Sequence, residues 1–356
     1  MTVLTWFGVV AGALVLAALA YQGVGSALDA RRLPPPGRLV DVGGHRLHLA
    51  TAGEGQPVVI FESGIGASSL NWWRVQRAVA EFTSACVYDR SGYGWSDLSP
   101  RTPTAGEACD QLERALESAG LAPPFVLVGH SFGGYVLQIF AARHPASVAG
   151  LVLADSITWP EWRAPGRAQS RALAGGALFA RIGAVVAALG VVRFALNRLQ
   201  AGSTGVPKAV LGAFGSAATG VVTRIVGEVA KMPPETWPAI RAHWSRPKSF
   251  RAIARHLLAL PRGAGEVEAA LTGVTRWPFP VVVLTSGAAT PSQIALQRQL
   301  ADLSDHGRQL VVRASHWIHL DEPALIVKVI RDVVEQVRTD GAKGRTSAPP
   351  SRRADL

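Results

Sequence analysis

The sequence predicts an α/β fold in which helices cover both faces of a mostly parallel sheet. Short continuous apolar runs of buried-strand type alternate along the chain with stretches of helical spacing. Parallel neighbours need crossover helices, so this alternation indicates a parallel sheet whose chemistry gathers at the carboxyl ends of the strands. The 356 residues are 48% hydrophobic and 17% charged, which is typical of a globular protein with some membrane contact rather than of a disordered chain.

The N-terminal segment, residues 1–28, carries no Asp, Glu, Lys, Arg or His. Its stretch from Val3 to Tyr21 is long enough to cross about 30 Å of hydrocarbon, so we predict an uncleaved single-pass membrane anchor. A cleaved signal peptide is the alternative, because residues 18–20 resemble a cleavage site, although a positively charged region before the apolar core is absent. Arg31, Arg32 and Arg38 follow the segment and favour a cytoplasmic location for the rest of the chain.

A proline-rich linker is predicted at residues 29–38, because consecutive prolines hold an extended conformation. Alternating apolar and polar residues on either side of Gly43 and Gly44 then predict a two-stranded hairpin. Further strands are predicted at 57–61, 85–89, 124–129, 150–155, 280–287 and 308–313, and helices at 68–82, 104–120, 132–145 and 322–338. The residues after 339 are polar and small, so a disordered tail is predicted at 339–356.

A long insertion, residues 157–275, separates two parts of the predicted core, 39–156 and 276–338. Between residues 157 and 280 there are 16 Lys and Arg against 5 Asp and Glu, a surplus of 11 that equals the net charge of the whole chain. With no nucleic-acid module visible, this favours an anionic lipid surface as partner over nucleic acid, the alternative being a solvated basic face. Arg181 and Arg193 interrupt the apolar stretch in this insertion, so amphipathic helices are predicted there instead of a second membrane span.

The pentapeptide Gly129-His130-Ser131-Phe132-Gly133 matches the pattern G-x-S-x-G at a predicted strand-to-helix junction. Glycines there let strand and helix approach closely, while the serine occupies a strained position with its hydroxyl projecting above the sheet. The following helix points its amide dipoles at the same place, which favours developing negative charge. We therefore predict that Ser131 is a nucleophile, and a structural turn is the simpler alternative.

With this motif, "YDRSGYGWSD" at 88–97 and "ASHWIHLDEP" at 314–323, the sequence resembles the α/β-hydrolase superfamily from about residue 39 to 338. The resemblance implies an α/β-hydrolase fold: a mostly parallel eight-stranded sheet with a helical cap inserted after strand 6. It also implies a serine nucleophile, an acid and a histidine in that order along the chain. Serine at the elbow disfavours the branches of the family that use an aspartate nucleophile.

Serine needs a neighbouring base to take its proton, and nine histidines compete for that role. His316 follows a predicted strand directly and corresponds to the catalytic histidine of the family, so we predict it as the base, with His319 as the alternative. The family would place the acid after the seventh strand, where "AATPSQ" contains no carboxylate. In the strand order that the resemblance implies, Asp155 ends the strand beside the elbow strand, about 4.8 Å away, and it is predicted as the acid ahead of Asp302 and Asp305.

The resemblance further implies an oxyanion hole built from the backbone N–H groups of Phe132 and Ile65. No metal cluster or phosphate loop is visible in the sequence, so neither a metal nor a cofactor is predicted. The expected activity is hydrolysis of a carboxylic ester, or a related acyl bond, of a small hydrophobic substrate through a seryl acyl-enzyme. An amide or C–C bond hydrolase with the same triad, and a catalytically silent binding protein, are the alternatives.

Overall fold

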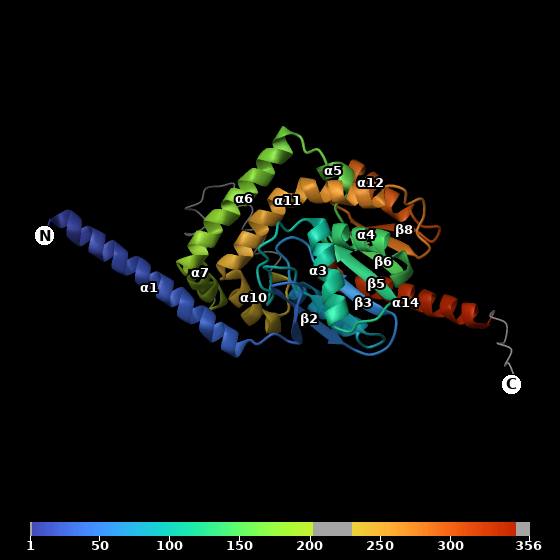
Figure 1. Cartoon of the computed structure of the whole chain (residues 1–356), viewed down its shortest axis with the longest axis horizontal. Helices are drawn as coiled ribbons and strands as arrows, with labels where there is room; N and C mark the ends of the chain where they lie inside the picture. Colours follow the sequence, from blue (N-terminus) through green and yellow to red (C-terminus); the bar gives the residue numbers. More distant parts are fainter. Residues whose placement is uncertain (1, 202–229, 347–356) are drawn as a thin grey trace.

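A computed structural model describes residues 2–201 and 230–346, and in this part of the chain it contains an eight-stranded sheet (Figure 1). The strand order is β1-β2-β4-β3-β5-β6-β7-β8; β1 and β2, and β2 and β4, pair antiparallel, and every other pair is parallel. The strands are β1 (Arg38–Asp41), β2 (Arg46–Ala52), β3 (Val58–Glu62), β4 (Ala85–Tyr88), β5 (Phe125–His130), β6 (Val148–Ala154), β7 (Val281–Ser286) and β8 (Arg308–Val312). The predicted mostly parallel sheet of the α/β-hydrolase fold is confirmed.

Helices cover both faces of this sheet. The helices α2 (Trp73–Val79) and α14 (Pro323–Thr346) pack on one face, where Val59 and Phe61 of β3 point. On the other face, where Val58 and Ile60 point, lie α3 (Ala105–Ser118), α4 (Gly133–Arg143) and α12 (Pro291–Ala301). Because successive strand residues point to opposite faces, the continuous apolar runs of the central strands fill two separate cores.

Between β6 and β7 the chain forms α5 (Trp159–Trp162), α6 (Arg167–Ala188), α7 (Val191–Gln200), α10 (Trp237–Trp244) and α11 (Pro247–Leu271). These helices lie to one side of the sheet in Figure 1. Small side chains of α6, including Ala177 and Ala180, are buried against α11, which allows the two helices to approach closely. The helix α6 is long and apolar enough to cross a membrane, yet 28% of its most apolar window is buried within the protein. Residues 202–229 of the predicted cap lie outside the described residues.

The N-terminal helix α1 (Val3–Arg32) projects away from the rest of the molecule (Figure 1). It is also long and apolar enough to span a membrane, with a mean hydropathy of 2.3 over its most apolar window of 18 residues. Residues 29–32, which we predicted as the start of the linker, form the last turn of this helix. Asp29 explains the extension: its carboxylate is buried and pairs with Arg193 of α7 at 2.5 Å and Arg241 of α10 at 2.9 Å. Breaking a buried ion pair of this kind typically costs about 3–5 kcal/mol.

The C-terminal helix also differs from the prediction. Helix α14 continues to Thr346, so residues 339–346 are helical rather than disordered. Adding residues to a helix that is already formed and packed requires no new nucleation, which allows polar residues to extend it into solvent. Residues 347–356 of the predicted tail lie outside the described residues.

Candidate active site

Ser131 lies in the tight turn between β5 and α4. Its φ of 53° is left-handed, and Asp155 is the only other non-glycine residue of the described chain with a positive φ. The turn is crowded: a Cβ atom on Gly133 would lie 2.6 Å from the backbone oxygen of Glu62, and one on Gly134 would lie 1.8 Å from Ser156 Oγ. These close contacts explain why glycines occupy positions 133 and 134. The left-handed backbone of Ser131 is strained, and such strain concentrates at functional sites.

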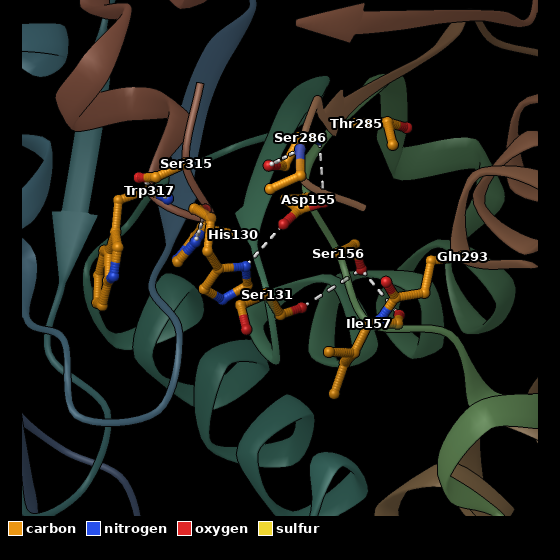
Figure 2. A network of polar contacts seen from close by, with 12 residues as sticks. His130, Ser131, Asp155, Ser156, Ile157, Thr285, Ser286, Gln293, Ser315 and Trp317 are labelled. Carbon is orange, nitrogen blue, oxygen red and sulfur yellow. Dashed lines mark hydrogen bonds and ion pairs between the residues drawn. The ribbon is translucent and has the colours of Figure 1, made fainter. Parts of the chain in front are cut away.

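Asp155 follows β6, the strand next to the one that carries Ser131, and the Ser131 N–H donates to the Ala154 oxygen at 3.2 Å. The structure brings Asp155 together with His316: Asp155 Oδ2 lies 2.7 Å from His316 Nδ1. Figure 2 shows Asp155 and Ser131 close to each other at the rim of the sheet. Ser131 Oγ makes no hydrogen bond to His316 in the described structure, although both residues line one cavity. Such bonds are often long until a substrate binds.

The other carboxylate oxygen of Asp155, Oδ1, accepts hydrogen bonds from the Gln297 side chain at 3.1 Å and from the Ser286 N–H at 3.2 Å. Burial raises the pKa of the Asp155 carboxyl, but the hydrogen bonds from His316, Gln297 and Ser286 outweigh burial and hold the pKa below its usual value. Ser286 ends β7, immediately before the stretch in which the family resemblance would put the acid. A backbone donor to Asp155 therefore stands there, and Gln297 of α12 is a contributor that the sequence reasoning missed.

The two alternative acids lie elsewhere. Asp302 pairs with Arg298 at 3.0 Å, and Asp305 pairs with Arg276. Both carboxylates are exposed and precede β8, whereas His316 follows it. Neither contacts His316.

The alternative base, His319, is buried with its ring stacked on Trp72 at 4.3 Å. Neither of its ring nitrogens has a hydrogen-bond partner, and burial lowers its pKa to about 3. The neighbouring His130 is also buried, and its Nε2 lies 2.8 Å from the His316 backbone oxygen, an acceptor, so His130 carries its proton on Nε2. His130 and His319 thus pack beneath the His316 loop, 4.5 Å apart.

The loop after β3 runs against the serine turn. A Cβ atom on Gly64 would lie 3.2 Å from Ser131 Cβ, and Ile65 lines the same cavity as Ser131. Among the described contacts, the N–H groups of Ile65 and Phe132 donate to no protein acceptor. Two free N–H groups beside a serine are what an oxyanion hole requires.

Arg90, which comes from the quoted "YDRSGYGWSD" stretch but received no role there, holds this loop. Its buried guanidinium donates to the backbone oxygens of Ser63 and of Gly64, the latter at 2.7 Å, and pairs with the Glu62 carboxylate. It also lies over the Phe132 ring at 5.1 Å. In a trans peptide the C=O and the following N–H point in opposite directions, so a Gly64 oxygen turned toward Arg90 turns the Ile65 N–H away from it.

The cavity beside Ser131 has a volume of about 260 Å³. Its described walls are mainly apolar and include Met232, Ile240, Trp244, Ile253 and Trp317. No Asp, Glu, Lys or Arg is among the lining residues of this part of the chain. Residues 2–201 and 230–346 also hold no group of three His, Cys, Asp or Glu side chains that could bind a metal ion. The arrangement fits an uncharged, largely apolar ligand.

Comparison with known proteins assigns the class. A family model described as the alpha/beta hydrolase fold matches residues 57–181, which include the serine turn and Asp155. A thermophilic esterase from Thermogutta terrifontis has a similar structure, with a TM-score of 0.59 and 19% identity over 84% of this chain and 98% of that one. An enol-lactonase from Burkholderia xenovorans gives a TM-score of 0.56 and 18% identity over 84% of this chain and all of that one. The described chain has the α/β-hydrolase fold, and residues 57–181 match the family model of that fold.

Curated relatives match over shorter segments. An AB hydrolase superfamily protein of Gibberella zeae is 37% identical over 105 residues, which are 28% of this chain and 33% of that protein. An uncharacterized vacuolar membrane protein of Saccharomyces cerevisiae is 32% identical over 110 residues, which are 30% of this chain and 17% of that protein. The matching segment spans a third or less of the length of these relatives.

Proposed function

We propose that the chain is a membrane-anchored serine hydrolase that cleaves a carboxylic ester, or a related acyl bond, of a small hydrophobic molecule. The observation that carries the proposal is the 2.7 Å contact between Asp155 and His316, beside the strained Ser131. A histidine fixed by a carboxylate at Nδ1 has its other nitrogen free to accept a proton. The apolar, uncharged cavity supports the substrate class.

In the proposed reaction, Ser131 Oγ attacks the carbonyl carbon and His316 Nε2 takes the hydroxyl proton. The carbonyl oxygen becomes an oxyanion that accepts hydrogen bonds from the N–H groups of Phe132 and Ile65. His316 then gives its proton to the leaving alcohol oxygen as the C–O bond breaks, which leaves an acyl group on Ser131. Water attacks this ester with His316 again as base, and the acid product and free serine form.

The apolar helix α1, together with the vacuolar membrane relative, supports attachment to a membrane. Arg31 and Arg32 in its last turn favour the cytoplasmic side for the hydrolase core. Protease protection of sealed membrane vesicles that contain the full chain would test the side. In vesicles whose cytoplasmic face points outward, digestion of the core only after the membrane has been permeabilised would contradict the cytoplasmic location.

Labelling with a fluorophosphonate probe tests the activity, because only an activated serine reacts quickly. We expect fast labelling of the full chain and none of the Ser131→Ala variant at equal folded amounts. The lack of a direct hydrogen bond from Ser131 to His316 favours a second candidate, a catalytically silent binding protein. Absence of labelling in folded wild-type protein would support that candidate and overturn the hydrolase. If the wild-type protein is labelled, comparison of its rates on matched ester, amide and C–C substrates would separate the remaining reaction classes.

A further inference from the structure

The end of the region between β6 and β7 that lies nearest α1 carries an exposed apolar patch. Its side chains are Leu178, Ile182 and Val185 of α6 and Phe194 of α7. The three α6 residues are spaced four and three apart and therefore form one stripe along the helix. Outside α1, these are four of the six large apolar side chains that the described chain exposes. Such gathering marks an interaction surface, whereas isolated exposed apolar residues are ordinary.

This patch is continuous with the apolar surface of α1. Gly190, in the turn between α6 and α7, contacts α1: a Cβ atom there would lie 2.6 Å from the Tyr21 ring and 3.5 Å from the Ala18 oxygen. From this contact toward its N-terminus, α1 exposes large apolar side chains such as Phe7 and Leu14. Figure 1 shows α7 and the end of α6 beside the point at which α1 leaves the body of the protein.

A buried polar network holds α1 in this position. The Arg193 guanidinium of α7 donates to Gln22 at 3.0 Å and pairs with Asp29 at 2.5 Å, and Gln22 donates to the Ser245 oxygen at 2.9 Å. Arg241 of α10 binds the second Asp29 oxygen. Because the three helices α1, α7 and α10 share these contacts, α1 is a rigid part of the protein rather than a loose tether, and it sets the height of the patch relative to the bilayer.

The charges around the patch identify the partner. Residues 167–200 contain five arginines and no Asp or Glu, and Arg171, Arg181 and Arg198 are exposed beside the apolar stripe. An apolar stripe flanked by arginines is the pattern of helices that lie in the interface of an anionic bilayer. A protein partner or a second copy of the chain would not explain why the patch joins the membrane helix.

We propose that the patch formed by Leu178, Ile182, Val185 and Phe194 inserts into the interface of the bilayer that α1 spans, with the neighbouring arginines on anionic headgroups. This inference rests on the proposed membrane anchoring and extends it to the cavity. Helix α10, which is bound to α1 through Arg241, also supplies Ile240, His243 and Trp244 to the cavity beside Ser131. The wall of the cavity therefore sits against the membrane anchor, and the substrate class is a hydrophobic ester dissolved in the bilayer.

Single cysteine labels test the proposal, because the two native cysteines, Cys86 and Cys109, are both buried. The full chain is reconstituted in phosphatidylcholine vesicles with phosphatidylglycerol, and an environment-sensitive maleimide dye is placed at Val185→Cys. Leu14→Cys reports insertion of α1, and Ser292→Cys, an exposed position on α12, serves as the solvent control. We expect lipids with brominated chains to quench the dyes at positions 14 and 185, and not the dye at 292.

Quenching at position 14 without quenching at 185 would overturn the proposal and leave the anchor intact. Lack of quenching at both positions would overturn the anchor as well. Protection of the dye at 185 that depends on protein concentration rather than on lipid would assign the patch to a second copy and also overturn the proposal.

A functional measurement complements the labels. In a variant with Ile182→Glu and Val185→Glu, we expect a several-fold lower rate on a long-chain ester in the vesicles, and an unchanged rate on a short water-soluble ester. Both side chains are exposed and line no described part of the cavity, so the variant should fold normally. The rate on the short ester serves as the control for folding and for the chemical step. Equal rates for the variant and the wild type on both esters would contradict the proposal.

Discussion

Replacing Asp155 by Asn changes the proton position on His316 rather than the shape of the site. In the wild type, Asp155 Oδ1 accepts from the Gln297 side chain and the Ser286 N–H, and Oδ2 faces His316 Nδ1 at 2.7 Å. The asparagine oxygen must stay with the two donors, so its NH₂ group takes the place of Oδ2. An NH₂ group only donates, and Nδ1 then has to accept.

The consequence follows from the tautomer. When Nδ1 of His316 accepts, the ring proton resides on Nε2, and this nitrogen can no longer take the proton of Ser131. We expect kcat to fall by up to about 10⁴-fold, equivalent to about 5.4 kcal/mol of transition-state stabilisation. The free energy of unfolding should change little, because a hydrogen bond to Nδ1 is still made.

The assay compares initial rates of ester hydrolysis and of fluorophosphonate labelling for wild type, Asp155→Asn and the matched control Asp305→Asn. Asp305 is exposed and pairs with Arg276, so its replacement should leave both rates unchanged. An Asp155→Asn variant that keeps activity within about tenfold of wild type would refute the assignment of the acid, as would a large loss in Asp305→Asn.

Three further predictions follow from the structure. Replacing Arg90 by Gln should lower kcat by up to about 10²-fold with little change in KM, because the Ile65 N–H loses its orientation; a change in KM alone would contradict this reading. Gly134→Ala should lower the free energy of unfolding by about 1–3 kcal/mol, because the added methyl group would clash with Ser156. The control Gly175→Ala in α6, where no atom lies within 4 Å, should raise the free energy of unfolding by up to about 1 kcal/mol; urea unfolding measures both. Burial lowers the pKa of His319 to about 3, so below pH 6.5 the unfolded state binds a proton that the folded state does not. The free energy of unfolding should therefore fall as the pH drops from 6.5 toward 3, and His319→Phe should make that fall shallower by about 1.4 kcal/mol per pH unit. An unchanged slope in the variant would count against the argument.

The central strands, from β3 to β7, were predictable because each lies in a contiguous apolar run. A stretch such as Val148–Ala154 is buried almost throughout, and no polar residue interrupts it. The adjacency of Asp155 and His316 was also accessible from the sequence, since the carboxyl ends of parallel strands share one edge. The catalytic roles of these residues and of Ser131, Phe132 and Ile65 stay predictions until the variants are measured.

The parts that sequence reasoning missed depend on side chains that meet partners far along the chain. Arg90 folds back onto the Ser63 and Gly64 carbonyl oxygens, and backbone acceptors leave no mark in a sequence. Asp29 extends α1 because Arg193, 164 positions away, neutralises it. Residue spacing reports local periodicity, whereas such pairs exist only once the chain has folded.

Gln297 of α12 links Asp155 to the start of the segment between β6 and β7. The chain leaves the rim at Ser156, immediately after the carboxylate, and enters the helices that enclose the substrate cavity. The Gln297 side-chain amide binds two consecutive residues at this point: it donates to the Asp155 side chain at 3.1 Å and to the Ser156 backbone oxygen at 3.0 Å. A shift of these helices would therefore act on α12 as well as on Asp155, and the contact between Asp155 and His316 is supported from a second element.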